Sequence, residues 1–208
     1  MEYNNNITLI DELSVLAEKN NKIDPEYYSK YDVKRGLRNS NGSGVLVGLT
    51  AIGEVHGYVI TDSEKVPDEG RLTYRGINVV DIVNGFQTEN RYGYEEVCYL
   101  LLFGELPDSD GLKRFSNLLG GLRTLPDNFT EDMILKAPSP DIMNKLARST
   151  LALYSYDNNP DDTSIKNILR HSIELIARFP VMVAYAYQAK SHYYNNNSLF
   201  IHKPRVDL

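Results

Sequence analysis

Cysteine, tryptophan and long apolar runs are scarce or missing in this sequence. Of its 208 residues one is cysteine, Cys98, and none is tryptophan. A single thiol excludes an internal disulfide framework and a zinc site built from several cysteines, and it favours a reducing, cytoplasmic setting. The longest apolar stretch, around 179–187, is interrupted by Pro180 and falls short of the ~20 residues that a membrane span requires. We therefore expect a cytoplasmic protein that does not enter the membrane.

An excess of positive charge is missing as well. The formal net charge is -6 and the sequence pI is about 5.3. An acidic chain without a basic stripe has no broad attraction to nucleic acid or to an anionic membrane surface. The first ten residues also lack the basic start and apolar centre of a secretory signal. We expect neither nucleic-acid nor membrane partners.

The remaining composition is typical of a globular protein, with 42% apolar and 24% charged residues. Residues 1–44 are polar and predict a loosely attached N-terminal arm and linker. Residues 45–208 predict a mainly α domain with one small antiparallel sheet near its start, because Val, Ile, Thr and Tyr cluster in three extended segments. These predicted strands are 45–50, 54–60 and 71–74.

From residue 77 onward the apolar spacing is helical. It predicts helices over 78–83, 94–103, 108–122, 141–156 and 164–187 or beyond, besides one over 7–19 in the arm. Asn78 is the expected N-cap of the first, while Gly85 and Gly104 are expected to end the first and second. In the second helix we expect one apolar face. Its members are Tyr94, Val97, Cys98 and Leu101.

The last predicted helix is the most informative. Its first half is amphipathic, but residues 181–187 are apolar all the way round. A helix without a polar face must be covered on every side. Because few residues of this chain remain to cover it, we expect another subunit to cover this helix.

The sequence contains no self-contained catalytic or metal-binding motif. The four histidines, at 56, 171, 192 and 202, are never three or four residues apart, and only His171 has a carboxylate, Glu174, at helical spacing. We therefore predict no metal ligands, no cofactor-binding residues and no catalytic residues in this chain, and Cys98 is interpreted as a packed thiol. Arg75-Gly76 remains open between an anion site at a helix N-terminus and a turn with a surface arginine.

Several ordered segments resemble the N-terminal part of citrate synthase. In chain order they are G-L-T-A-I at 48–52, G-R-L-T-Y-R-G-I-N-V-V-D-I at 70–82, Y-E-E-V-C-Y-L-L-L-F-G-E-L-P at 94–107, I-A-R-F-P-V-M-V-A-Y at 176–185 and K-P-R-V-D-L at 203–208. The resemblance covers about 45–208 and implies the first part of that family's large helical domain. It implies a homodimer whose interface involves the helices around 141–156 and 164–189, because the corresponding helices of this family pack at its dimer interface. It also implies that Arg75-Gly76 is a tight turn whose arginine pairs with a carboxylate or a backbone carbonyl.

The family's activity is the condensation of acetyl-CoA with oxaloacetate to citrate and CoA in the tricarboxylic acid cycle, without a metal or cofactor. The resemblance implies that activity for a full-length protein. The histidine signatures G-x-x-H-G-G-A-N and G-F-G-H-R are absent here. We therefore expect a fragment that lacks the small domain and is inactive alone. The alternatives are a 2-methylcitrate synthase that uses propionyl-CoA, and a non-catalytic helical dimerisation module.

Overall fold

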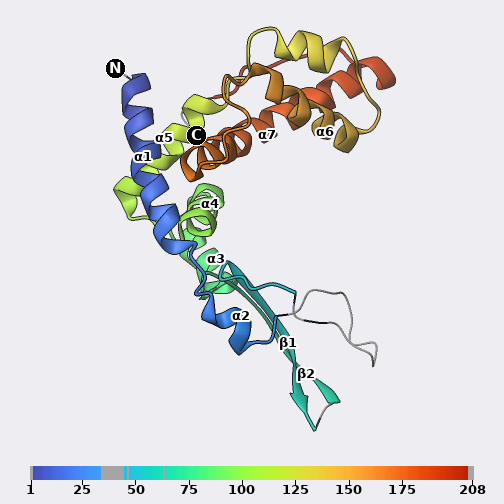
Figure 1. Ribbon diagram of the computed structural model, residues 1–208. Coiled ribbons are helices and arrows are strands. Elements are labelled where there is room, and N and C mark those ends of the chain that lie inside the picture. The colour runs from blue at the N-terminus through green and yellow to red at the C-terminus, as the bar shows by residue number, and fades with distance from the viewer. Residues whose placement is uncertain (1, 34–44, 46, 63, 206–208) are drawn as a thin grey trace. The chain divides into compact units, whose positions relative to one another are not determined.

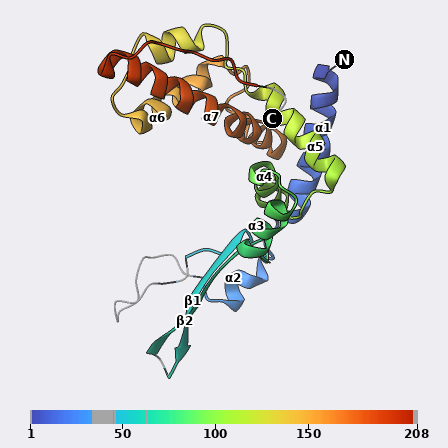
Figure 2. The same cartoon turned by 180° about the vertical axis from the view of Figure 1, so that it is seen from behind.

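The computed structural model describes residues 2–33, 45, 47–62 and 64–205. It is mainly helical with one three-stranded antiparallel sheet, as the sequence predicts (Figures 1 and 2). The elements are α1 Glu2–Asn20, α2 Glu26–Lys30, β1 Gly53–Thr61, β2 Glu64–Tyr74, β3 Ile77–Asn78, α3 Val79–Thr88, α4 Tyr94–Phe103, α5 Ser109–Leu122, the π-helix η1 Thr130–Leu135, α6 Ile142–Leu153, the 3-10 helix η2 Tyr154–Tyr156 and α7 Ile165–Asn195.

The chain divides into two compact units. Unit 1 comprises Met1–Ser14 and Lys113–Leu208, and unit 2 comprises Val15–Leu112. Helices α1 and α5 each contribute residues to both units. The domain boundary expected at residue 44 lies outside the described residues, so that part of the prediction stays open.

The loose attachment predicted for the N-terminal arm is wrong for α1. Leu13 and Ala17 are buried. At the end of the helix, Asn20 Nδ2 donates a hydrogen bond of 2.7 Å to the backbone oxygen of Phe103, the last residue of α4. The apolar spacing of the helix predicted over 7–19 already includes Leu13 and Ala17, but the polar composition of residues 1–44 favoured a loose arm.

The sheet is a long β1–β2 hairpin extended by the two residues of β3. Pairing runs from Gly53 opposite Tyr74 to Thr61 opposite Glu64, and it shifts near Gly57, where β2 has extra residues. Such a bulge twists the strand locally. The strand predicted over 45–50 is wrong for residues 47–50, which have no regular structure; residue 46 is not described. Residues 77–78, which directly precede the first residue of α3, also form the short strand β3.

A two-residue turn links β2 to β3. Arg75 and Gly76 have φ values of 51° and 82°, and Tyr74 pairs with Ile77 across them. Two positive φ angles are typical of a type I′ hairpin turn, which glycine tolerates at no steric cost. The next residue of β3, Asn78, then caps α3 by accepting a hydrogen bond of 3.0 Å from the backbone nitrogen of Val80, as predicted.

The core of unit 2 is formed mainly by α4. Its buried residues are Glu96, Tyr99, Leu100 and Phe103. The Tyr99 and Phe103 rings meet edge to face with centroids 4.6 Å apart. The predicted apolar face of this helix is therefore wrong. Helix α4 ends at Gly104 with φ 83°, as predicted, whereas α3 continues past Gly85 to Thr88.

The core of unit 1 lies between η1, α6 and α7, which is drawn beside α6 in both views (Figures 1 and 2). Its buried members are Phe129, Ile134, Leu153, Val181, Met182, Tyr185 and Ala189. Lys145 of α6 is also buried, and its amine donates hydrogen bonds to the backbone oxygens of Met133 and Ala137. Burial lowers the pKa of Lys145. The amine thus ties the end of η1 to α6.

Helix α7 is continuous through Pro180 and is covered on only one side within unit 1. Val181, Met182, Tyr185 and Ala186 are buried there. Four residues at helical spacing stay exposed, namely Pro180, Val183, Ala184 and Tyr187. On α6, Met143, Ala147 and Leu151 form a similar exposed stripe. We call these seven residues the α6–α7 stripe.

Candidate functional site

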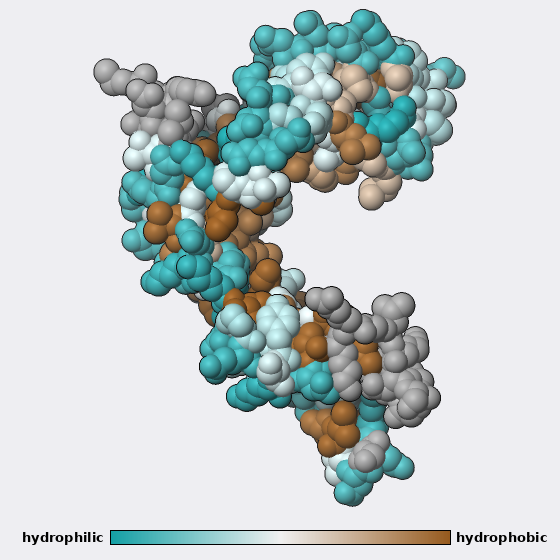
Figure 3. All heavy atoms as spheres, viewed as in Figure 1, coloured by the Kyte–Doolittle hydropathy of each residue, from teal (hydrophilic) through white to brown (hydrophobic). Residues whose placement is uncertain are grey.

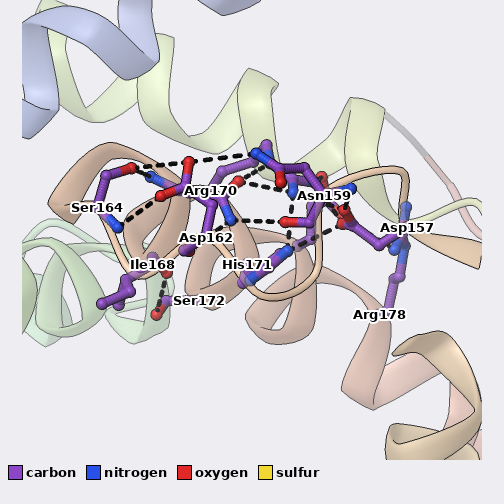
Figure 4. A network of polar contacts seen from close by, with 11 residues as sticks. Asp157, Asn159, Asp162, Ser164, Ile168, Arg170, His171, Ser172 and Arg178 are labelled. Carbon is purple, nitrogen blue, oxygen red and sulfur yellow. Dashed lines mark hydrogen bonds and ion pairs between the residues drawn. The ribbon is translucent and has the colours of Figure 1, made fainter. Parts of the chain in front are cut away.

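The densest polar cluster of unit 1 is built on the loop between α6 and α7 (Figure 4). Ser164 starts α7 by accepting a hydrogen bond of 3.3 Å from the backbone nitrogen of Asn167. Asp162 in turn accepts a hydrogen bond of 2.8 Å from the backbone nitrogen of Ser164. These side chains satisfy backbone donors at the N-terminus of α7 and fix the loop on the first turn of the helix.

Asp157 is the centre of the cluster. Its carboxylate lies 2.7 Å from Arg170 Nη1 and 2.9 Å from His171 Nε2, and it accepts a hydrogen bond of 2.7 Å from the backbone nitrogen of Asn159. The side chain is 13% exposed. Hydrogen bonds from Arg170 hold the pKa of Asp157 well below its ordinary value, although burial acts in the opposite direction.

A second carboxylate extends the cluster along α7. Glu174 accepts hydrogen bonds of 3.1 Å from Arg170 and 2.9 Å from Arg178, each one turn away on the helix. Of the two residues with ligand-like spacing in the sequence, His171 thus faces Asp157, and Glu174 binds Arg170 and Arg178. The contact between Arg170 and Asp157 raises the pKa of the arginine. We refer to Asp157, Arg170, His171, Glu174 and Arg178 as the Asp157 network.

A cavity of about 540 Å³ borders this network. Apolar side chains, including Leu153 and Leu175, complete its wall. A catalytic base must have a lone pair within reach of a substrate proton. Here the carboxylates bind arginines, and the ring nitrogen of His171 that faces Asp157 also lies 2.7 Å from Arg170 Nη2. The geometry thus supports a structural role, in which the network anchors the α6–α7 loop.

Asp157→Asn tests this role through the pH dependence of stability. Because the folded-state pKa of Asp157 is lowered, the carboxylate stabilises the fold above its ordinary pKa of 3.8, and this stabilisation is lost as pH falls further. We expect the substitution to lower the free energy of unfolding by about 2 kcal/mol at pH 7 and to flatten its decline below pH ~4. Denaturant unfolding monitored by circular dichroism between pH 3 and 7 measures both effects.

Asp161→Asn is the matched control, since Asp161 lies in the same loop and accepts its hydrogen bonds from the neutral Tyr154 hydroxyl. It should change stability at pH 7 by less than about 1 kcal/mol. An equal loss in both variants would contradict the role assigned to Asp157.

The other histidines lie at separate places. His56 is on the hairpin, with Nε2 2.7 Å from Asp68, and it lowers the pKa of that carboxyl. His192 Nδ1 is 2.8 Å from the backbone oxygen of Asn197 near the end of α7. His202 stacks on Phe200 with ring centroids 6.4 Å apart. In unit 2, burial raises the pKa of the Cys98 thiol, which disfavours the nucleophilic thiolate.

The contacts of Arg75 distinguish between the two interpretations of Arg75-Gly76, an anion site or a turn with a surface arginine. Its guanidinium donates hydrogen bonds to the backbone oxygens of Leu101 (2.8 Å) and Asn20 (3.3 Å), and to the side-chain oxygen of Asn21 (2.6 Å). These acceptors lie at the C-terminal ends of α4 and α1, where helix carbonyls lack partners and the dipole is negative. Arg75 is therefore a cap for two helices, and the anion-site interpretation is wrong.

Among the described residues, no three His, Cys, Asp or Glu side chains are arranged to hold a metal ion. Across the same part of the chain, none of the helices has the length and apolar character needed to cross a membrane.

Most of the chain matches known proteins. The family model described as "Citrate synthase, C-terminal domain" matches residues 41–205. Citrate synthase of Corynebacterium glutamicum is 29% identical over 206 residues, covering 90% of this chain and 45% of that protein. Citrate synthase of Saccharolobus solfataricus is 31% identical over 159 residues, covering 76% and 36%. 2-Methylcitrate synthase 1 of C. glutamicum is 29% identical over 157 residues, covering 75% and 35%.

The fold also resembles that of a solved citrate synthase. The crystal structure of citrate synthase from Pyrobaculum aerophilum matches with a TM-score of 0.61 at 24% identity, covering 83% of this chain and 41% of that one. The chain thus spans less than half the length of these relatives. The ordered sequence segments, the family model and the fold lead to one conclusion: this chain belongs to the citrate synthase family.

Proposed function

We propose that these residues form the scaffold of an acyltransferase that condenses acetyl-CoA with oxaloacetate and releases citrate and CoA, the reaction of the tricarboxylic acid cycle. The observation that carries the proposal is the family match over residues 41–205. The relatives named citrate synthase support the acetyl-CoA reaction. No metal or cofactor takes part in the proposed chemistry.

The catalytic groups of this reaction are proposed to lie outside the 208 residues. Removing a proton from the acyl methyl group requires a positioned carboxylate base and a hydrogen-bond donor for the enol. Of the carboxylate–histidine pairs described above, His56–Asp68 lies on the exposed hairpin and His171–Asp157 is engaged by Arg170. Neither pair combines a free base with a substrate cavity, and the family's histidine signatures are absent from the sequence.

The 208-residue polypeptide is therefore expected to release no thiol from acetyl-CoA in the presence of oxaloacetate. Family-like turnover of about 1 s⁻¹ or more would contradict this expectation. The assay follows free CoA with a thiol reagent, in the Cys98→Ser variant so that the protein itself does not react. Citrate synthase of C. glutamicum serves as the active control.

The acyl group of the full-length enzyme is a second question, because 2-methylcitrate synthases are also among the relatives. One additional methylene in a pocket changes specificity by about 10–200-fold. We propose acetyl-CoA as the better substrate. The test of this preference is the ratio of kcat/KM for acetyl-CoA to kcat/KM for propionyl-CoA. It is measured on an active protein that contains these residues. A ratio below one would identify the 2-methylcitrate synthase alternative.

The α6–α7 stripe is proposed to contact a second copy in a homodimer. Its seven residues are exposed and apolar or small, and Ala147 and Ala184 allow two helices to approach closely. The stripe covers part of the two helices around 141–156 and 164–189. An apolar face of this extent on paired helices is typical of an interaction surface.

Ala184→Asp is expected to break the contact through the stripe and so to lower the molar mass in solution, because it places a charge in the centre of the stripe. The matched control is Tyr193→Asp, because Tyr193 lies on the opposite face of α7 from Ala184 and is 50% exposed. This control should leave the dimer intact. Light scattering at several protein concentrations measures the mass, and a wild-type chain that stays monomeric throughout would contradict the proposal.

A further inference from the structure

The two long edges of the β1–β2 hairpin differ in their protection. A free strand edge presents unpaired backbone groups, and proteins protect such edges with proline, charge and bulges. The outer edge of β2 has all three, in Pro67, in its charged side chains and in the bulge opposite Gly57. Strand β1 contains no proline, and its one Asp, Glu, Lys or Arg side chain, Glu54, lies near one end. In the described ranges β1 is the first strand of the sheet and pairs only with β2.

The faces of the hairpin are also uncovered. Val55 is 84% and Ile60 is 68% exposed, although β-branched side chains usually pack in sheets. In Figure 3 hydrophobic residues reach the surface over the hairpin. Two strands alone are marginally stable in water, and additional strands stabilise them. A weakly protected edge together with exposed apolar side chains on the faces favours strand addition at β1.

The sequence of β1 is complementary to itself. The strand has nine residues, Gly53–Thr61, and Gly57 is its centre. Antiparallel pairing of two copies about Gly57 aligns all nine residues, with Val55 opposite Val59 and His56 opposite Tyr58. Glu54 then lies opposite Ile60, so no like charges face each other. Apolar and aromatic cross-strand pairs of this kind stabilise a sheet.

We propose that β1 is an assembly edge, at which the β1 strand of a second copy adds antiparallel about Gly57 to form a sheet continuous through both chains. This contact is separate from the α6–α7 stripe and does not depend on the proposed enzymatic activity. A two-fold contact of this type is isologous, since the same strand serves both copies.

Gly57→Cys tests the edge directly, with Cys98 replaced by serine. In the proposed register the two introduced thiols are directly opposite, at a distance suited to a disulfide. A Cβ at Gly57 meets nothing within 4 Å, and the same holds for Gly70 of β2, so Gly70→Cys is the matched control. Under mild oxidation we expect about tenfold more covalent dimer from Gly57→Cys than from Gly70→Cys. Equal yields, or no dimer from either variant, would overturn the proposal.

Two further variants separate the edge from other contacts. Val55→Lys, added to Gly57→Cys, should reduce the cross-link by removing the Val55–Val59 pair, whereas Val66→Lys on β2 should not. Val66 is also exposed, at 44%. The cross-link should persist in the Ala184→Asp background, where the α6–α7 contact is broken. A cross-link that requires Ala184, or that is insensitive to Val55→Lys, would also contradict a β1–β1 contact.

Discussion

Phe129→Ala is expected to lower the free energy of unfolding of unit 1 by about 3–5 kcal/mol, the cost of deleting a fully buried aromatic ring. Phe129 has no exposed surface and belongs to the same cluster as Ile134 and Met182. Its ring meets Tyr156 edge to face with centroids 5.4 Å apart. The substitution therefore removes apolar contacts from three elements at once and leaves a cavity that the rigid helices cannot close.

Hydrogen exchange of the α6 and α7 amides measures this loss within unit 1, since it reports local as well as global opening. Tyr193→Ala is the control, because it removes an aromatic ring of similar size from an exposed position of α7. It should change protection by less than about 1 kcal/mol. Similar losses in the two variants would show that the cluster around Phe129 is not the core of unit 1.

Arg75→Ala is expected to destabilise unit 2 by about 2–4 kcal/mol, because three acceptors at two helix ends lose a charged donor together. Arg75→Gly should be less harmful by about 1 kcal/mol, since glycine adopts the positive φ of this turn without the steric cost of a Cβ. The difference separates the contribution of the guanidinium from that of the backbone. Denaturant unfolding, with exchange of the α4 amides, measures both.

Arg71→Ala controls for the loss of a positive charge nearby in the chain, since Arg71 lies in the adjacent strand β2 and is exposed. Its expected effect is below about 0.5 kcal/mol. If Arg75→Ala were no more harmful than this control, the capping role would be refuted. Arg75→Lys should lie between the two, because an ammonium cannot reach three acceptors with the geometry of a guanidinium.

Local sequence signals predicted the structure correctly where the interacting residues are close together in the chain. The N-cap at Asn78 and the stop at Gly104 follow from side-chain and backbone chemistry within a few residues. The ladder of Arg170, Glu174 and Arg178 was not predicted, although its i, i+4 spacing is a local signal of helical ion pairs. The contacts of Asp157 have no such signal, because this residue reaches Arg170 and His171 across an irregular loop.

The face of α4 shows a different limit. This helix is apolar on most sides, so periodicity did not distinguish the buried face from the others. Glu96 would be placed in solvent by its charge, yet it is buried and lies 2.8 Å from Arg91 Nη2. Likewise, the acceptors of Arg75 at residues 20 and 21 are more than fifty positions away, and only the packing of α1 against α4 brings them together.

The buried amine of Lys145 gives unit 1 an internal chemical reporter. Exposed lysines react with acylating reagents in the native state, but this amine is enclosed and donates to two backbone carbonyls. It reacts only when α6 separates from the end of η1. The rate of acylation at Lys145 therefore follows the opening of that junction, and mass spectrometry of one peptide can record it without any unfolding agent.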